Sequence, residues 1–295
     1  MKMPALLWFQ LNLLDQPVFP LQIMAATAQP TKLEVCQSVE AHDASDFFQG
    51  KPVIDLRRAA VLIPLFFKDD QIYVLLTMRS KKLRTHGGEV AFPGGKKDEE
   101  DKDIVATALR EAEEEIGLPQ DQVEVVAQLP PSISKEGLVV TPVVGFIRAD
   151  FVPKPNPEEV SYAFSAPLVD FASSEKHTAN NMNFQGRSFI MHFFAHQQPF
   201  KPHKEILTWG LTAYMAIIVA CIVYNRPPDF EVDSGFDWQN PTKAAEGTFS
   251  RYCQRNGISY DGGYEQQSKI WWILLYILQN RFNQCSTVWN EVNIL

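Results

Sequence analysis

This 295-residue chain has few residues or motifs of several kinds, and each scarcity excludes a class of function. Positive charge is outweighed, because 27 Lys and Arg stand against 35 Asp and Glu and give a formal net charge of −8. Nucleic-acid binding needs a basic face, so we expect no nucleic-acid partner. The four cysteines show no paired spacing, which argues against a disulfide framework and a zinc site. Gly94-Gly95-Lys96 lacks the spacing and the Ser or Thr of a P-loop.

Long apolar runs are also few. Residues 206–224 are uncharged over roughly the thickness of a bilayer. Gly210, Thr212 and Cys221 in this run suit close helix packing, so we interpret it as a buried helix of an α/β core. Residues 4–14 resemble a weak signal-peptide core, but no clean cleavage site follows them. We therefore expect no stable membrane span.

The remaining pattern predicts a layered α/β (α+β) domain. Residues 59–67 form an apolar run of strand length, Asp69-Asp70 marks a turn, and residues 71–78 read as the partner strand of a hairpin. Further strands are expected at 123–129, 138–147 and 188–195, with helices at 101–116 and 206–224. Strands followed by a helix, twice over, favour one layered domain. We place it at residues 51–235, between a variable extension at 1–50 and a C-terminal extension of unknown role at 236–295.

The predicted helix at 101–116 carries a cluster of carboxylates. Its apolar residues recur with helical spacing and form one stripe, at Val105, Leu109, Ala112 and Ile116. Gly117 is suited to end the helix, since a left-handed residue is common there. Glu111, Glu114 and Glu115 follow the spacing i, i+3, i+4 and share a face beside that stripe.

Three like charges within one turn repel each other, and a bound cation would remove that penalty. Mg²⁺ and Mn²⁺ take carboxylate oxygens, so the sequence predicts a metal site at Glu111, Glu114 and Glu115. Arg110 lies four residues before Glu114 and is expected to orient the cluster. Glu113 points elsewhere and is expected to be solvated. The alternative interpretation of such an acidic run is a solvated helix face without a metal.

The segment that precedes this helix supplies groups suited to an anionic substrate. Arginine side chains can bind phosphate oxygens through two hydrogen bonds, a hydroxyl adds a donor, and paired glycines let the backbone approach a ligand closely. An aromatic ring can stack on a base or pack in the core. The candidate substrate-binding residues are Arg79, Ser80, Arg84, Phe92, Gly94 and Gly95.

Residues 95–118 resemble the sequence signature of the Nudix hydrolases. The nine residues from Arg110 to Leu118 match that signature fully. The first half differs, because Asp101 stands where the signature has Glu and eight rather than seven residues separate it from Arg110. No role is therefore predicted for Asp101. The resemblance implies an α/β/α sandwich with a mixed central sheet, Mg²⁺ or Mn²⁺ as cofactor, and hydrolysis of a phosphate anhydride.

A narrower resemblance extends over residues 75–95, which match the signature of the coenzyme A diphosphatase branch at every fixed position. Segments 155–160 and 210–213 are also similar to the peroxisomal members of this branch. This implies hydrolysis of coenzyme A and acyl-CoA to 3′,5′-ADP and 4′-phosphopantetheine or its acyl form. Glu111, Glu114 and Arg110 would then carry the catalysis, with Glu111 or a loop residue such as Glu136 accepting the proton of the water.

Two alternatives stay open at this point. The same chemistry could act on another dinucleotide, such as NADH or ADP-ribose, or the chain could be a non-catalytic nucleotide-binding module. The resemblance also implies a peroxisomal location. The chain ends in Asn293-Ile294-Leu295, however, and this is not a peroxisomal signal. Cytoplasm and mitochondrion are therefore alternative locations.

Overall fold

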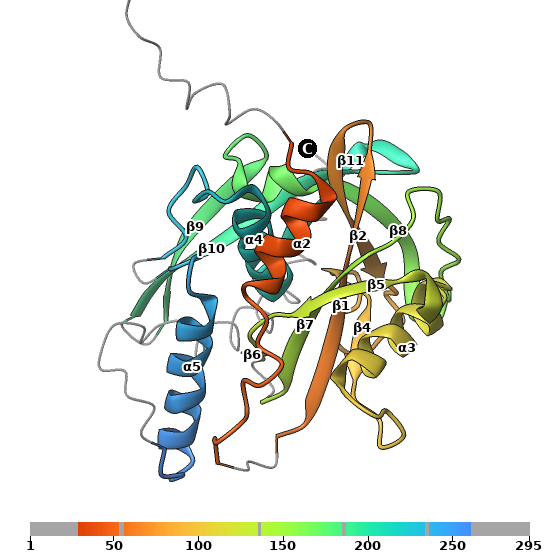
Figure 1. The fold of residues 1–295 in the computed structure, drawn as a ribbon. Coiled ribbons are helices and arrows are strands. Elements are labelled where there is room, and N and C mark those ends of the chain that lie inside the picture. The colour runs from red at the N-terminus through yellow and green to blue at the C-terminus, as the bar shows by residue number, and fades with distance from the viewer. Residues whose placement is uncertain (1–28, 53–55, 135–136, 185–186, 234–235, 261–295) are drawn as a thin grey trace, which may run out of the picture.

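The computed structural model describes residues 29–52, 56–134, 137–184, 187–233 and 236–260. Figure 1 shows a twisted sheet with helices on both faces. Five strands form the continuous order β3-β2-β1-β7-β5, and β4, β6 and β8 pair at its margins with β1, β7 and β2. β1 and β7 run parallel, while the other pairs are antiparallel, so the central sheet is mixed. The predicted layered fold is confirmed.

The hairpin at the centre of the sheet is formed by β1 (Arg58–Lys68) and β2 (Gln71–Arg79). β1 is buried along most of its length, as a strand covered on both faces must be. Asp69 and Asp70 both have positive φ, at 50° and 56°, which is the conformation that a two-residue hairpin turn of type I′ requires. The predicted hairpin and turn are therefore present.

The remaining strands extend this sheet and build a second one. β3 (Val90–Ala91), β4 (Gly94–Lys96), β5 (Glu124–Gln128), β6 (Ser132–Ile133), β7 (Val139–Phe146) and β8 (Val160–Pro167) complete the first. β9 (His177–Phe184), β10 (Arg187–Gln198) and β11 (Lys201–Trp209) form a three-stranded antiparallel sheet. Short 3₁₀ turns lie at Gln120–Gln122 and Leu168–Ala172.

Helix α3 (Ile104–Ile116) covers one face of the central sheet, and α2 (Lys32–Glu40) and α4 (Gly210–Tyr224) cover the other (Figure 1). α3 contributes Ala108, Ala112 and Ile116 to one apolar cluster, whereas α2 and α4 pack into a second and larger one. This arrangement is the α/β/α sandwich expected from the sequence. α5 (Pro241–Arg255) packs through Phe249 in a third, smaller cluster.

Strands β8, β9 and β11 were not predicted, and the helix expected from residue 101 begins at Ile104. Two further details differ from the expectation. The helix expected at 206–224 begins only at Gly210, because residues 206–209 pair with β10 as the end of β11. The helix is therefore 15 residues long, and no helix among the described residues has the length and apolarity needed to cross a bilayer. The second detail is α2, whose Val35 and Val39 belong to the main core. The boundary placed at residue 51 stays a prediction, but the packed body begins before it.

Candidate active site

Three glutamates from two separate segments meet at one end of the central sheet. Glu111 and Glu115 belong to α3, and Glu159 lies just before β8. One carboxylate oxygen from each of the three lies within 4.8 Å of the others. Oxygen donors at this spacing are the ligands that Mg²⁺ and Mn²⁺ prefer. We call Glu111, Glu115 and Glu159 the carboxylate cluster.

The orientation of α3 explains why Glu115 faces inward. The helix begins after Asp103, whose side chain accepts a hydrogen bond of 2.7 Å from the Ala106 N–H, and it ends at Gly117 with φ 67°. Val105 and Leu109 of the predicted stripe are only partly buried. The buried face differs from the predicted stripe and includes Glu115. It consists of Thr107, Ala108, Ala112, Glu115 and Ile116.

Glu114 lies away from the carboxylate cluster. Its side chain is 53% exposed and accepts a hydrogen bond of 3.0 Å from Arg110. Successive helix residues are about 100° apart, so Glu115 and Glu114 cannot both face the sheet. The structure therefore joins Glu111 and Glu115 with Glu159, where the sequence had predicted Glu114. Glu113 is exposed, as expected.

Glu159 is held in place by the loop that enters β8. The Asn156 N–H donates to the Glu115 backbone carbonyl at 2.9 Å, which ties the loop to α3. The Asn156 side chain then donates to Glu159 Oε1 at 3.4 Å, and the Glu159 backbone carbonyl accepts from the Ser80 N–H at 2.8 Å. The segment 155–160 resembles members of the coenzyme A diphosphatase branch, but the sequence predicted no role for Glu159. The only signal was an acidic pair in a proline-flanked turn directly before a strand.

Arg110 connects the acidic residues of α3 with the segment that precedes the helix. Its guanidinium makes two hydrogen bonds to Asp101, at 2.9 and 3.0 Å, and single bonds to Glu111 at 3.2 Å and to the Lys96 carbonyl at 3.0 Å. These bonds hold the pKa of the buried Asp101 carboxyl well below its usual range. Asp101 therefore does have a role, because it fixes the arginine that orients Glu111. The extra residue before Arg110 does not prevent this pairing.

The two glycines of β4 make room for the cluster. A Cβ on Gly95 would lie 2.4 Å from Glu111 Oε1, so only glycine lets this carboxylate lie against the strand. A Cβ on Gly94 would instead meet the Ala60 carbonyl oxygen at 2.3 Å, and Gly94 has φ +156°. The Gly94 N–H donates to Glu115 Oε2 at 3.2 Å. The close backbone approach predicted for these glycines is thus toward carboxylates.

Arg79 stands at the end of β2, next to the cluster. Its Nη1 lies 3.4 Å from Glu115 Oε1. Its Nε is buried and forms no hydrogen bond within the part of the chain that the structure describes. A buried polar group without a partner is costly and usually marks a place where a ligand or water completes the site.

The electrostatics of the cluster favour a cation. Burial raises the pKa of Glu115 to about 7, with Glu111 and Glu159 adding to the effect and Arg79 and the Gly94 N–H opposing it. Burial also raises the pKa of Glu111, against the influence of Arg110. Buried carboxylates that crowd together resist ionisation, and a divalent cation would remove this resistance.

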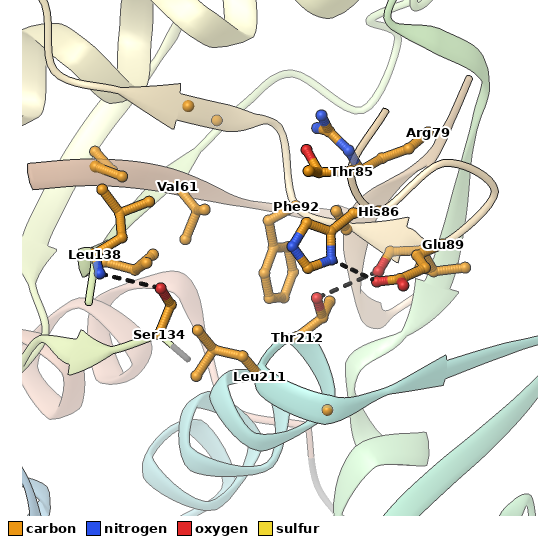
Figure 2. A pocket seen from close by; sticks show the side chains of 18 of the residues that line it. Val61, Arg79, Thr85, His86, Glu89, Phe92, Ser134, Leu138, Leu211 and Thr212 are labelled. Atoms are coloured by element: carbon orange, nitrogen blue, oxygen red, sulfur yellow. Dashed lines mark hydrogen bonds and ion pairs between the residues drawn. The ribbon is translucent and has the colours of Figure 1, made fainter. Parts of the chain in front are cut away.

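A cavity of about 270 Å³ opens beside Arg79, Gly94 and Gly95. Figure 2 shows Val61, Phe92, Leu138 and Leu211 pointing into it from different elements. Its walls are largely apolar, with polar groups at a few points, as is usual for a small-molecule site. Thr212 of α4 donates a hydrogen bond of 3.3 Å to the Val90 carbonyl at its edge. The other wall residues include Ala59, Ala60, Thr85, His86, Glu89, Ser134, Val140 and Trp209.

The other predicted substrate residues have different positions. Phe92 packs in the core, one of its two expected roles, and also lines the cavity. Ser80 is buried, and its hydroxyl accepts a hydrogen bond from the Lys82 N–H at 3.4 Å. Arg84 is exposed on the loop between β2 and β3 and does not line the cavity. Glu136, the alternative base, lies outside the described residues.

Comparison with known proteins places the site in a family. Residues 56–189 match the NUDIX domain. The chain is 41% identical over 190 residues to the peroxisomal coenzyme A diphosphatase NUDT7 of Mus musculus, and the match covers 64% of this chain and 79% of the mouse protein. It is 43% identical over 157 residues to the uncharacterized Nudix hydrolase NudL of Photorhabdus laumondii, covering 53% of this chain and 80% of that protein.

A plant relative is similar over a smaller share of its own length. Nudix hydrolase 15, mitochondrial, of Arabidopsis thaliana is 47% identical over 177 residues, which are 59% of this chain but 61% of the plant protein. The match thus spans less than two thirds of that relative. The mixed sheet between two helix layers, the cluster of α3 glutamates and these similarities together show that the chain belongs to the Nudix hydrolase family.

Proposed function

We propose that this Nudix hydrolase cleaves the pyrophosphate of coenzyme A and acyl-CoA, giving 3′,5′-ADP and 4′-phosphopantetheine or its acyl form. One observation carries the proposal: the carboxylate cluster lies beside Arg79, Gly94 and Gly95, and these three residues line a largely apolar cavity. The match of residues 75–95 to the coenzyme A diphosphatase signature and the name of the mouse relative support this choice of substrate.

Glu111, Glu115 and Glu159 would hold a divalent cation, Mg²⁺ or Mn²⁺. Their oxygens suit such an ion, and the glycine at position 95 leaves the space that Glu111 needs. When bound, such a cation would neutralise the negative charge of the phosphates and activate water for attack. Arg110 keeps Glu111 in position, and the Gly94 N–H and Arg79 do the same for Glu115.

The reaction itself needs little from the protein besides position and charge. A water oxygen forms a bond to one phosphorus, and the bond from that phosphorus to the bridging oxygen breaks. The bridging oxygen leaves with its electron pair on the other phosphate, and a carboxylate of the cluster accepts the proton of the water. Arg79, which lines the cavity, would donate to a phosphate oxygen.

The test is turnover by the purified chain with Mg²⁺ or Mn²⁺ on coenzyme A, NADH and ADP-ribose in parallel. We expect coenzyme A to be the best substrate and Glu115→Gln to abolish most of the activity. A preference for NADH or ADP-ribose would show that the proposed substrate is wrong, while hydrolysis of a pyrophosphate would remain the reaction. Binding of coenzyme A without metal-stimulated turnover would make the protein a binding module.

We also propose a peroxisomal location, on the basis of the mouse relative. The plant relative named mitochondrial makes the mitochondrion the alternative. Imaging of the protein with both of its natural ends exposed distinguishes peroxisome, mitochondrion and cytoplasm.

A further inference from the structure

The loop between β2 and β3 concentrates positive charge beside the cavity. It carries Lys81, Lys82 and Arg84, in a chain whose net charge is −8. The next two residues, Thr85 and His86, line the cavity itself. The cations therefore stand directly before the stretch of loop that a bound substrate would contact.

The loop is held in a fixed shape. The Leu83 N–H donates to the Ser80 carbonyl at 3.1 Å, and the Gly88 N–H donates to the Arg79 carbonyl at 3.1 Å. The Ser80 N–H donates to the Glu159 carbonyl, which joins the loop to the carboxylate cluster. The positions of the cations are thus tied to both Arg79 and the residues that would hold the metal.

Two of the three cations are not neutralised by the residues that the structure describes. Lys82 pairs with Glu158 at 2.7 Å, and the nearby Glu89 is occupied by His86 at 2.9 Å. Lys81 and Arg84 are exposed and form no ion pair within the described part of the chain. Lys81 lies back over the loop, since a Cβ on Gly88 would come within 3.5 Å of its Cγ.

We infer that Lys81 and Arg84 bind the 3′-phosphate of the substrate and so select coenzyme A over dinucleotides that lack this group. The inference rests on the proposed function. The metal and Arg79 account for the charge of the pyrophosphate, whereas the 3′-phosphate is a separate phosphomonoester that needs its own cations. An arginine can hold such a group through two hydrogen bonds, and a lysine adds a point charge.

The test compares coenzyme A with dephospho-CoA, which differs only in the 3′-phosphate. In Arg84→Gln and Lys81→Gln/Arg84→Gln we expect kcat/KM for coenzyme A to fall roughly 10- to 100-fold, mainly through KM, as for lost charge-assisted hydrogen bonds. Turnover of dephospho-CoA should stay within about twofold of wild type, because the lost group has no partner there. Arg84→Lys should recover part of the loss.

Lys82→Gln is the matched control, because it removes one charge from the same loop at a residue that already pairs with Glu158. This variant should leave the ratio of kcat/KM for coenzyme A to kcat/KM for dephospho-CoA unchanged. If kcat/KM of the Arg84 variants falls equally for both substrates, or for neither, the inference is overturned. Cleavage of coenzyme A by the wild-type protein would still uphold the proposed function. Absence of wild-type cleavage of both substrates would overturn the two together. Thermal unfolding midpoints check that each variant is folded.

Discussion

At the scale of single residues, the site depends on which carboxylates converge. The i, i+3, i+4 spacing placed Glu111, Glu114 and Glu115 on one face, but only two of them turn toward the sheet. The third oxygen donor comes from Glu159, which is 44 positions beyond Glu115 in the chain. No helical periodicity can indicate such a partner, because the contact exists only after β8 has paired with β2.

Glu159→Gln tests this assignment. Removing a carboxylate from the cluster should lower metal-stimulated turnover at least about 10- to 100-fold, the loss typical of perturbed metal sites. Glu158→Gln is the control, since Glu158 is exposed and pairs with Lys82 outside the cluster. Steady-state rates across a range of Mg²⁺ concentrations measure the effect. Equal activity of the two variants would remove Glu159 from the metal site.

A second residue-scale prediction separates the two glycines. Gly95→Ala pushes against the far end of the Glu111 side chain, so it should lower activity strongly while shifting the unfolding midpoint little. Gly94→Ala meets backbone atoms of β1 and a φ that alanine rarely adopts, so it should destabilise the fold by about 1–3 kcal/mol. Activity assays and thermal unfolding of both variants check this. The opposite order of effects would contradict the close approach of Glu111 to β4.

At the scale of elements, part of the sheet was predictable. The eight-residue strands β8 and β9 and the short strands β3, β4 and β6 were not predicted. β1, β2, β5 and β7 are apolar runs of ordinary strand length, so period and composition reveal them. β3 and β4 are two and three residues long and pass through a glycine-rich turn, where only tertiary pairing defines a strand. The end of β11 was mistaken for helix because residues 206–209 continue the apolar run of α4.

The start of α3 gives an element-scale prediction. Asp101→Asn weakens the paired hydrogen bonds to Arg110, so we expect a loss of about 1–3 kcal/mol in unfolding free energy and reduced turnover as Glu111 loses its support. Asp98→Asn is the control, because Asp98 is 65% exposed and lies 3.6 Å from Arg110. Denaturant unfolding compares them. Equal stability of both variants would show that Asp101 does not anchor the helix start.

At the scale of the whole molecule, the carboxylate cluster lowers the stability of the metal-free protein, because its negative charges repel each other. A bound cation would remove this repulsion. The raised pKa of Glu115 means that the folded state holds its proton more tightly than the unfolded chain does. Ionisation therefore lowers the stability of the metal-free protein as pH rises. His177 and His196 act in the opposite sense, because burial lowers their pKa to about 4 and their protonation costs stability as pH falls below about 6.5.

Comparison with Glu115→Gln isolates the glutamate from these histidines. Without divalent cation, wild-type stability should fall between about pH 4.5 and pH 7 by on the order of 3 kcal/mol relative to the variant. Millimolar Mg²⁺ should remove most of this difference in wild type and change the variant less. Chemical denaturation at several pH values measures it. A parallel pH dependence of both proteins would contradict the buried, crowded position of Glu115.

The family could be identified from residues 110–118, the apolar pattern predicted a layered domain, and the resemblance to the family implied its two helix layers. The third carboxylate and the role of Asp101 could not, because both arise from packing between distant segments. The substrate is the central claim, and product analysis tests it most directly. Coenzyme A incubated with the purified chain and Mg²⁺ should yield 3′,5′-ADP and 4′-phosphopantetheine in equal amounts, and neither with Glu115→Gln. Intact coenzyme A after incubation with the wild-type protein, under conditions in which it cleaves NADH or ADP-ribose, would contradict the account.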